Sequence, residues 1–203
     1  RTTPDYAAID RALSMPVLKR EFFSEPVIIE KLELLQDRDN FIYRVRSRDG
    51  AEGVSIGHPF ISKQGYPMFN TGVIPHFVGE DARDLDRLVY DAAERNVKRQ
   101  GIPLCVQIAT AEFAVLDMLG TIANKSVGQL IGDIQNTEIA VYQGTRLAEL
   151  RRPDPEVSLP LVQQDLEETK ARAVKIRAGR GDNLGSDIDN APGRTEKLIR
   201  MAR

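Results

Sequence analysis

Two cationic residues, Lys175 and Arg177, stand two positions apart in the otherwise apolar run 173–177. The run predicts a short strand, and side chains two residues apart in a strand point to the same face. Two cations that face a protein interior are costly unless an anion meets them. A substrate carboxylate would be such an anion, and an exposed strand end with two solvated cations is the alternative.

The first third of the chain predicts an antiparallel meander after an N-terminal arm that could hold a short helix at 5–13. Its three strands are predicted over residues 27–34, 41–47 and 51–56. In the second strand, Tyr43, Val45 and Ser47 alternate with polar neighbours and therefore share one face. The Asp-Gly pair that precedes the third strand is typical of a tight turn.

The middle of the chain predicts a long loop and two helices. Residues 57–79 contain four glycines and three prolines, and long loops in compact domains are often functional. Helices are predicted over 80–99 and 104–123. The second is apolar around most of its surface, which predicts burial on nearly all sides. The single cysteine, Cys105, is expected to be a small buried side chain.

The pattern changes again in the last third, where strands and helices alternate. A strand is predicted over 138–142, a helix over 158–172, a strand over 173–177 and a helix from 194. This βαβα order is typical of a parallel sheet or barrel.

Five short motifs follow one another along residues 27–203. They are a turn with Asp-Gly at 46–53, a helix of the form E-x-A-l-x-D-l-x-G at 112–120, a closing segment at 126–132, and the two strands at 139–142 and 173–177. In kind and order they resemble the enolase superfamily, most closely its mandelate racemase and muconate lactonizing branch.

The resemblance implies a fold. An α+β capping domain, made of an antiparallel meander plus helices, would be followed by the first βα units of a TIM-type (β/α) barrel. We expect an N-terminal arm at 1–26, the capping domain at 27–135 and an incomplete barrel domain at 136–203. A complete barrel needs eight βα units and roughly 250 residues, so the barrel is expected to be truncated. The family's acidic Mg²⁺ ligands lie on later strands and are expected beyond residue 203.

The resemblance also implies a reaction. The superfamily abstracts a proton α to a carboxylate, and Mg²⁺ with fixed positive charge stabilises the enediolate. Arg177 stands where many relatives have a lysine base, and arginine stays protonated. We therefore expect Arg177 to bind the carboxylate, with Lys175 assisting or exchanging a proton. This favours dehydration of a hydroxy acid or sugar acid. A racemase, epimerase or cycloisomerase is the alternative, and a non-catalytic assembly protein is another.

Four further residues are candidates for contact with the substrate. The resemblance places residues 57–79 over the barrel mouth, where His58 and Tyr66 would face the pocket. Gln143 and Thr145 follow the first barrel strand and could touch the substrate. Ordinary hydrogen bonding or packing is the competing interpretation for each of the four.

Composition limits the partners. With 28 Lys and Arg against 30 Asp and Glu, the net charge of −2 lacks the basic footprint of a nucleic-acid binder. No apolar stretch approaches the ~20 residues that a membrane span needs, so no membrane partner is expected. The expected partners are a small carboxylate substrate and copies of the same chain in a homo-oligomer. Because the chain begins with Arg1, a cytoplasmic location is expected only by default and export stays open.

Overall fold

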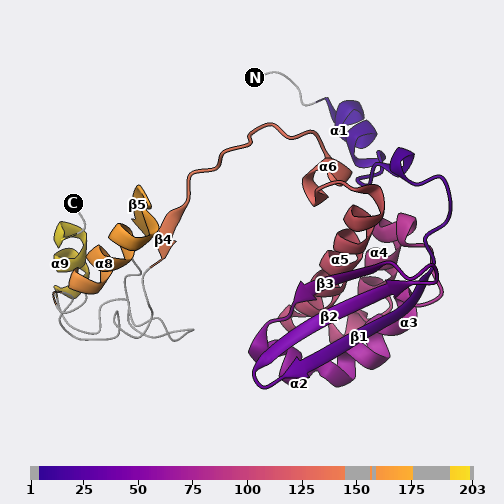
Figure 1. Ribbon diagram of the computed structural model, residues 1–203, viewed down its shortest axis with the longest axis horizontal. Helices are drawn as coiled ribbons and strands as arrows, with labels where there is room; N and C mark the ends of the chain where they lie inside the picture. The colour runs from indigo at the N-terminus through magenta and orange to yellow at the C-terminus, as the bar shows by residue number, and fades with distance from the viewer. Residues whose placement is uncertain (1–4, 145–155, 157–158, 176–192, 202–203) are drawn as a thin grey trace. The chain divides into compact units, whose positions relative to one another are not determined.

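The computed structural model describes residues 5–144, 156, 159–175 and 193–201 (Figure 1). Contacts divide the chain into two compact units, Arg1–Gln135 and Asn136–Arg203, and each is described by itself below. The predicted domain boundaries stay a prediction, because a break in contacts does not test whether either part folds alone.

The first unit is built on a three-stranded antiparallel sheet in the order β1-β2-β3. Its strands are β1 (Ile29–Asp37), β2 (Asn40–Ser47) and β3 (Glu52–Ile56). The predicted meander is confirmed. Tyr43, Val45 and Ser47 are buried on one face of β2, as their alternation predicted, while Ile42 on the opposite face is 40% exposed.

Helix α5 (Ile102–Ala123) packs against the buried face of this sheet and contacts β3, β2, α2 and α4. The helix is 22 residues long with a mean hydropathy of 1.6, which by length and composition would suit a membrane span. The prediction that no stretch is long enough is therefore wrong. Because 56% of its apolar window is buried inside the fold, α5 acts here as the central helix of a protein core.

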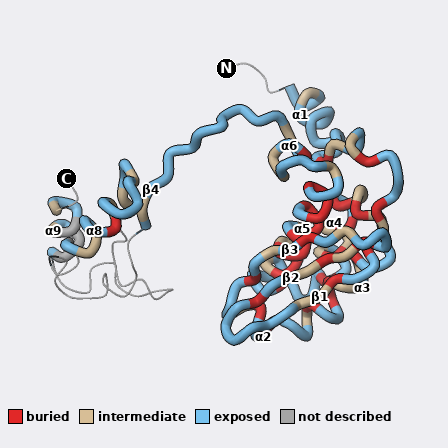
Figure 2. Tube along the Cα trace, in the orientation of Figure 1, coloured by how far each residue is buried: buried red, intermediate tan, exposed pale blue. Residues whose placement is uncertain are grey.

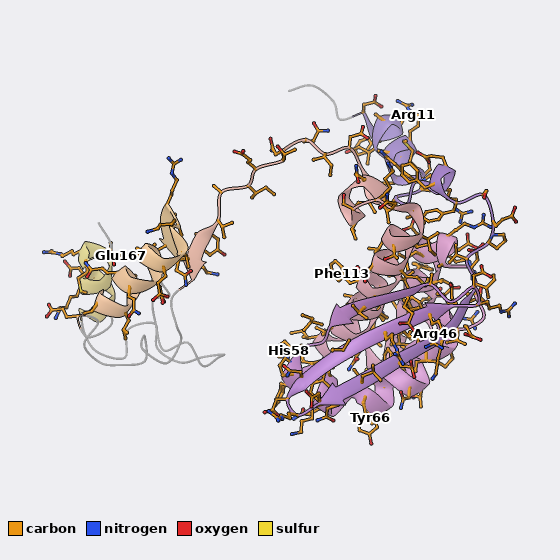
Figure 3. The ribbon with its side chains drawn as sticks, viewed as in Figure 1. Arg11, Arg46, His58, Tyr66, Phe113 and Glu167 are labelled. Atoms are coloured by element: carbon orange, nitrogen blue, oxygen red, sulfur yellow. The ribbon has the colours of Figure 1, made fainter. Side chains whose placement is uncertain are left out.

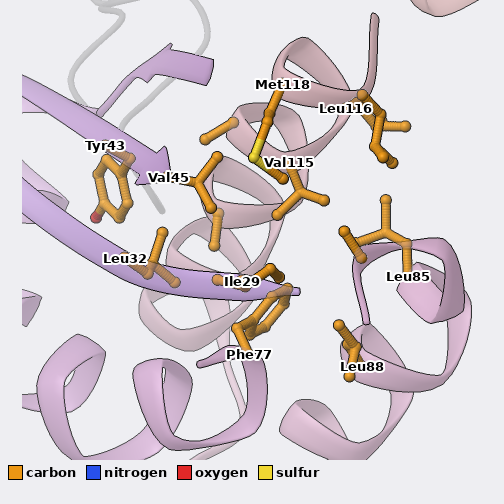
Figure 4. Close-up of a cluster of buried hydrophobic side chains, with 14 of the residues drawn as sticks. Ile29, Leu32, Tyr43, Val45, Phe77, Leu85, Leu88, Val115, Leu116 and Met118 are labelled. Atoms are coloured by element: carbon orange, nitrogen blue, oxygen red, sulfur yellow. The ribbon is translucent and has the colours of Figure 1, made fainter. Parts of the chain in front are cut away.

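The core lies between the sheet and the helices, where buried residues gather along the inner faces of β1, β2 and α5 (Figure 2). In Figure 4, Val45 of the sheet, Met118 of α5 and Leu88 of α4 converge on this region. One side of α5 stays open, since Phe113 is 60% exposed and Cys105 is exposed. The predicted burial of α5 on nearly all sides, and of Cys105, is wrong because apolar composition does not tell which stripe of a helix meets the sheet.

Strand β3 lies unusually close to α5 because residue 53 is glycine. A Cβ atom at Gly53 would stand 2.2 Å from the backbone N of Met118 and 2.3 Å from the carbonyl O of Ala114. Polar contacts fix the same approach: the Val54 N–H donates to the Asp117 carboxylate at 2.8 Å. Asp117 therefore has a structural role, as it satisfies a backbone donor of an edge strand.

Residues 57–79 are helical, so the predicted long loop is wrong. The chain forms α2 (Pro59–Met68), a π-helical turn η2 (Phe69–Val73) and α3 (Ile74–Phe77). Pro59 and Pro75 stand in the first turns of α2 and α3, where a missing N–H costs nothing. Gly65 permits close packing, since a Cβ there would lie 2.3 Å from Nε2 of Gln107. Pro59 and Pro75 thus serve helix starts and Gly65 serves helix packing, while Pro67 lies inside α2.

A buried hydrogen-bond network ties α2 to the sheet and to α5. The Tyr43 hydroxyl donates to Oε1 of Gln107 and lies 3.2 Å from Oγ of Ser62. Nε2 of Gln107 donates to the carbonyl of Ile61 at 3.3 Å. Burial raises the pKa of Tyr43, only partly offset by its hydrogen bond with Ser62. The network satisfies the polar groups that α2 brings into the core.

The remaining short elements of the first unit frame this core. They are α1 (Tyr6–Leu13), η1 (Arg20–Phe22), η3 (Ala82–Asp84), α4 (Leu85–Glu94), η4 (Val97–Arg99) and α6 (Val127–Ile131). The helix predicted over 80–99 is therefore α4 with a short 3-10 turn at each end. The arm packs on its own unit, because Leu18 is buried and the Lys19 N–H donates to the carbonyl of Leu130 at 2.8 Å.

Asp81 joins the arm, the sheet and the start of η3. Its carboxylate accepts from the Val27 N–H at 3.1 Å, from the Arg83 N–H at 3.0 Å and from the Arg83 guanidinium at 2.8 Å. Burial raises the pKa of Asp81, but the hydrogen bonds from Arg83 and Val27 outweigh it and leave the pKa lowered. The charged form is therefore favoured in the folded state.

We expect Asp81→Asn to destabilise the protein by about 1–2 kcal/mol at neutral pH, because the charged acceptor of several donors is lost. A lowered folded-state pKa contributes stability above the unfolded pKa, and this contribution is lost as pH falls through the folded value. The difference between the two proteins should shrink on acidification. Urea unfolding from pH 7 to about pH 3 measures it, and a difference independent of pH would contradict the assignment.

The second unit contains a parallel strand pair. Strand β4 (Tyr142–Gly144) pairs with β5 (Ala173–Lys175), and helix α8 (Leu159–Thr169) lies between them along the chain. Helix α9 (Arg194–Met201) follows. The alternation of strand and helix is confirmed for these residues. The strand predicted over 138–142 is displaced, since residues 138–141 form no strand and only Tyr142 belongs to β4.

Candidate functional site

The paired ends of β4 and β5 carry the candidate catalytic lysine. Because the strands are parallel, their carboxyl ends meet, and Lys175 stands opposite Gly144 in the register. Lys175 is exposed, and its Nζ lies 5.8 Å from the centre of the Tyr142 ring. Nε2 of Gln143 donates to the carbonyl of Gly144 at 3.0 Å. The register places Lys175 on the same face as Tyr142, whereas Gln143, opposite Val174, points to the other face of the strand pair.

Two of the predicted site residues, Arg177 and Thr145, lie outside the described residues. The shared face of Lys175 and Arg177, and the contact of Thr145 with a substrate, therefore stay predictions. What the geometry supplies is the strand itself: residues 173–175 are extended, and in an extended chain the second residue after Lys175 would point to the same face.

The other two predicted residues, His58 and Tyr66, lie on α2 of the first unit (Figure 3). Nδ1 of His58 accepts from the Ile61 N–H at 3.4 Å, so this histidine is the N-cap of α2. Tyr66 is 55% exposed and lines an open hollow of about 450 Å³ with Lys63. Leu34, Gln36, Phe41 and Asn70 complete the hollow. A role of either residue toward a substrate stays a prediction.

Comparison with known proteins identifies the fold. No family model and no curated protein matches the chain. A proposed racemase from Roseobacter denitrificans is 25% identical with a TM-score of 0.73, over 87% of this chain and 46% of its own. A mandelate racemase/muconate lactonizing protein from Paracoccus denitrificans, complexed with magnesium, is 22% identical with a TM-score of 0.62, over 74% and 42%.

A proposed galactarate dehydratase from Agrobacterium radiobacter, bound to Na and L-malate, is 18% identical with a TM-score of 0.67, over 87% of this chain and 45% of its own. The chain has the N-terminal fold of solved enolase-superfamily structures of the mandelate racemase and muconate lactonizing kind. The resemblance stated from the motifs is confirmed. The chain spans less than half the length of these three relatives.

The enolase-like helix motif at 112–120 has a packing explanation in this structure. Asp117 holds the edge strand β3, as described above. Gly120 allows the chain after α5 to fold back, since a Cβ there would lie 2.8 Å from the carbonyl O of Lys125. These contacts give both positions a structural role in the first unit.

Glu112, the first residue of that motif, is half-buried on α5. Burial raises the pKa of Glu112, and the nearby charge of Asp86 raises it further. Asp86 itself accepts a hydrogen bond from the Val17 N–H of the arm at 3.3 Å. The charged form of Glu112 is therefore disfavoured in the folded protein.

We expect Glu112→Gln to stabilise the protein at neutral pH. A carboxyl pKa that is raised by folding lowers the stability of the protein. The loss is complete at a pH above the folded-state pKa and absent at a pH below the unfolded-state pKa. The gain should therefore fade as pH falls to the ordinary glutamate range of about 4. Thermal unfolding followed at both pH values measures it. A variant less stable than the parent at neutral pH would show that Glu112 has a favourable partner.

Metal ligands are the part of an enolase-type site that the described residues do not show. Within residues 5–144, 156, 159–175 and 193–201, no three His, Cys, Asp or Glu side chains gather so that they could hold a metal ion. The described residues therefore do not fit a Mg²⁺ site. On the face of Lys175 they offer one cation and the aromatic ring of Tyr142, with the amide of Gln143 on the opposite face.

Proposed function

We propose that this chain forms part of an enzyme that abstracts a proton α to a carboxylate. The reaction that we favour is the dehydration of a hydroxy acid or sugar acid. In this proposal, β4, α8, β5 and α9 are the first βα units of a (β/α) barrel. The similarity to the Roseobacter protein supports it, since it covers 87% of this chain and so extends past Gln135 into the second unit.

The observation that carries the proposal is the place of Lys175 at the carboxyl edge of two parallel strands. Active sites of (β/α) barrels are built at this edge. An ammonium group there would bind a substrate carboxylate, and its positive charge would favour the enediolate, on which a second negative charge develops. Arg177 would add a second cation that cannot act as a base.

Magnesium enters the proposal through relatives alone. The Paracoccus protein is complexed with magnesium and the Agrobacterium protein is bound to Na and L-malate. When bound, a divalent metal would stabilise the charge of the enediolate. No step is assigned to it here, because the described residues form no site for it.

The choice between dehydration and isomerisation depends on how many bases reach the substrate. Racemisation by two bases needs one on each face of the α-carbon, and Arg177 in place of a lysine base removes one of them. Dehydration needs one base for the α-proton and one acid for the departing hydroxyl, so it stays possible when arginine replaces the lysine base. The racemase, epimerase and cycloisomerase alternatives keep support from relatives described with such activities.

The test is proton exchange in D₂O. The polypeptide as the cell makes it is incubated with Mg²⁺ and a panel of hydroxy acids and sugar acids, and the α-proton is followed by NMR. Loss of the α-proton signal together with a new 2-keto acid supports dehydration. Inversion of the α-carbon with a mass gain equal to one incorporated deuterium supports racemisation. Ring closure of an unsaturated diacid, incubated as an additional substrate, supports cycloisomerisation.

Absence of exchange across the panel in a folded preparation would contradict the proposed chemistry. If that preparation is also a stable homo-oligomer, the non-catalytic assembly role gains the support. Light scattering of the same sample reports the oligomeric state, which stays a prediction. An acid-inactivated sample serves as the control for spontaneous exchange.

A further inference from the structure

A basic hollow of about 410 Å³ opens in the first unit, between the η2–α3 segment and the turn after α4. Its lining residues are Thr71, His76, Arg95, Asn96, Val97, Lys98 and Arg99. Arg95, Lys98 and Arg99 carry permanent charge at neutral pH, and no acidic side chain is among the lining residues. We call these seven residues the basic hollow.

The cations of the basic hollow are not neutralised by the protein. Within the part of the chain that the structure describes, Arg95, Lys98 and Arg99 form no ion pair with an acidic side chain. Arg87, about two turns before Arg95 on α4, behaves differently, since it pairs with Glu80, Asp84 and Asp91. Several uncompensated cations around one concave surface raise the local positive potential and attract anions.

A buried asparagine joins the two segments that line the basic hollow, the η2–α3 segment and the turn after α4. Asn96 is buried, and its Nδ2 donates to the carbonyls of Gly72 and Ala92, each at 2.8 Å. Residue 72 must be small, because a Cβ there would lie 2.8 Å from Oδ1 of Asn96. The spacing of the walls is therefore set before any ligand arrives, which lowers the entropic cost of binding.

One guanidinium is also oriented in advance. Nη1 of Arg99 donates to Oγ1 of Thr71 at 3.3 Å, and that hydroxyl donates in turn to the carbonyl of Pro67 at 2.8 Å. The other nitrogens of Arg99 stay available to a ligand. A guanidinium held in this way can form two parallel hydrogen bonds to one oxyanion.

Helix ends oppose an anion here, but they do not outweigh the cations. Helices α3 and α4 end at Phe77 and Glu94, close in sequence to His76 and Arg95. A helix C-terminus carries about half a negative charge, and less in short helices. Three full positive charges exceed two such partial charges. The balance favours an anion with more than one charge and an affinity that is modest.

We propose that the basic hollow binds a small oxyanion that carries at least two negative charges, such as a phosphate group or a polycarboxylate. Arg95, Lys98 and Arg99 supply the charge, and His76 supplies a further nitrogen. The proposal does not depend on the proposed reaction, because none of these residues belongs to β4 or β5.

The test is isothermal titration calorimetry of the intact protein with inorganic phosphate and, separately, with citrate, at an ionic strength fixed with NaCl. We expect saturable binding of one anion per chain. Arg95→Gln and Lys98→Gln should each weaken it by about tenfold, as expected when one charge-assisted contact is lost. Arg11→Gln removes an exposed cation of α1 that is not part of the basic hollow, and it should leave the affinity for the anion unchanged.

The two titrants separate the sources of the anion, since tighter phosphate indicates a phosphate ligand and tighter citrate a polycarboxylate. Lys175→Gln must retain the heat of binding, which distinguishes this hollow from the proposed catalytic site. Binding that is absent, that follows ionic strength alone, or that survives both Arg95→Gln and Lys98→Gln would overturn the proposal. The two variants change exposed side chains, and circular dichroism verifies that they fold.

Discussion

Gly53→Ala is expected to destabilise the first unit by about 3 kcal/mol or more, at the upper end of the range for overpacked cores. The added Cβ would stand 2.2 Å from the backbone N of Met118 and 2.3 Å from the carbonyl O of Ala114. Both are backbone atoms in the middle of α5, so no side-chain rotation can relieve the clash. The edge strand would have to move away from the helix, which would break the Val54–Asp117 hydrogen bond as well.

Urea unfolding followed by circular dichroism measures the effect as a lower midpoint at an unchanged slope. Gly132→Ala is the matched control, because residue 132 has an extended φ of −173° and the nearest atom to an added Cβ is 3.9 Å away. The control should change stability by less than about 0.5 kcal/mol. Equal stability of Gly53→Ala and the parent would mean that β3 and α5 are farther apart than described.

The sequence predicted those strands and helices whose pattern of apolar residues can be recognised within one continuous segment. Alternation placed Tyr43 and Val45 in the core, and the apolar run after Pro103 predicted the central helix. Prediction failed where the residue type is required by a contact with a residue that is far away in the sequence. Gly65 and Gly72 suggested a loop, yet each is small because Gln107 or Asn96 approaches it. Those contacts join segments far apart along the chain, so no local pattern contains them.

The candidate site follows the same division. The strand character of residues 173–175 and the pairing partner of Lys175 agree with a βα unit that the sequence indicated. The N-cap role of His58 was missed, although a polar residue before Pro59 is a signal for a helix start. The basic hollow was missed because its cations come from one segment and its opposite wall from another, some twenty residues earlier.

Lys175→Gln is expected to lower kcat/KM for the proposed proton abstraction by about 100-fold or more, the usual cost of removing one group that stabilises a developing oxyanion. The amide keeps a polar group at the end of a slightly shorter side chain while it removes the charge. If the cation binds the carboxylate in the ground state and binds the enediolate more tightly, KM rises and kcat falls together. Lys170→Gln removes a charge from the same unit outside the candidate site and should leave both constants unchanged.

Lys175→Arg separates the two roles that remain open for this residue. An arginine keeps the positive charge and can bind a carboxylate, but it does not give up its proton. If Lys175 only binds and neutralises the substrate, the arginine variant should keep most of the activity that the glutamine variant loses. If Lys175 transfers a proton, both variants should be equally slow in the D₂O exchange assay. Full activity of Lys175→Gln would remove Lys175 from the reaction.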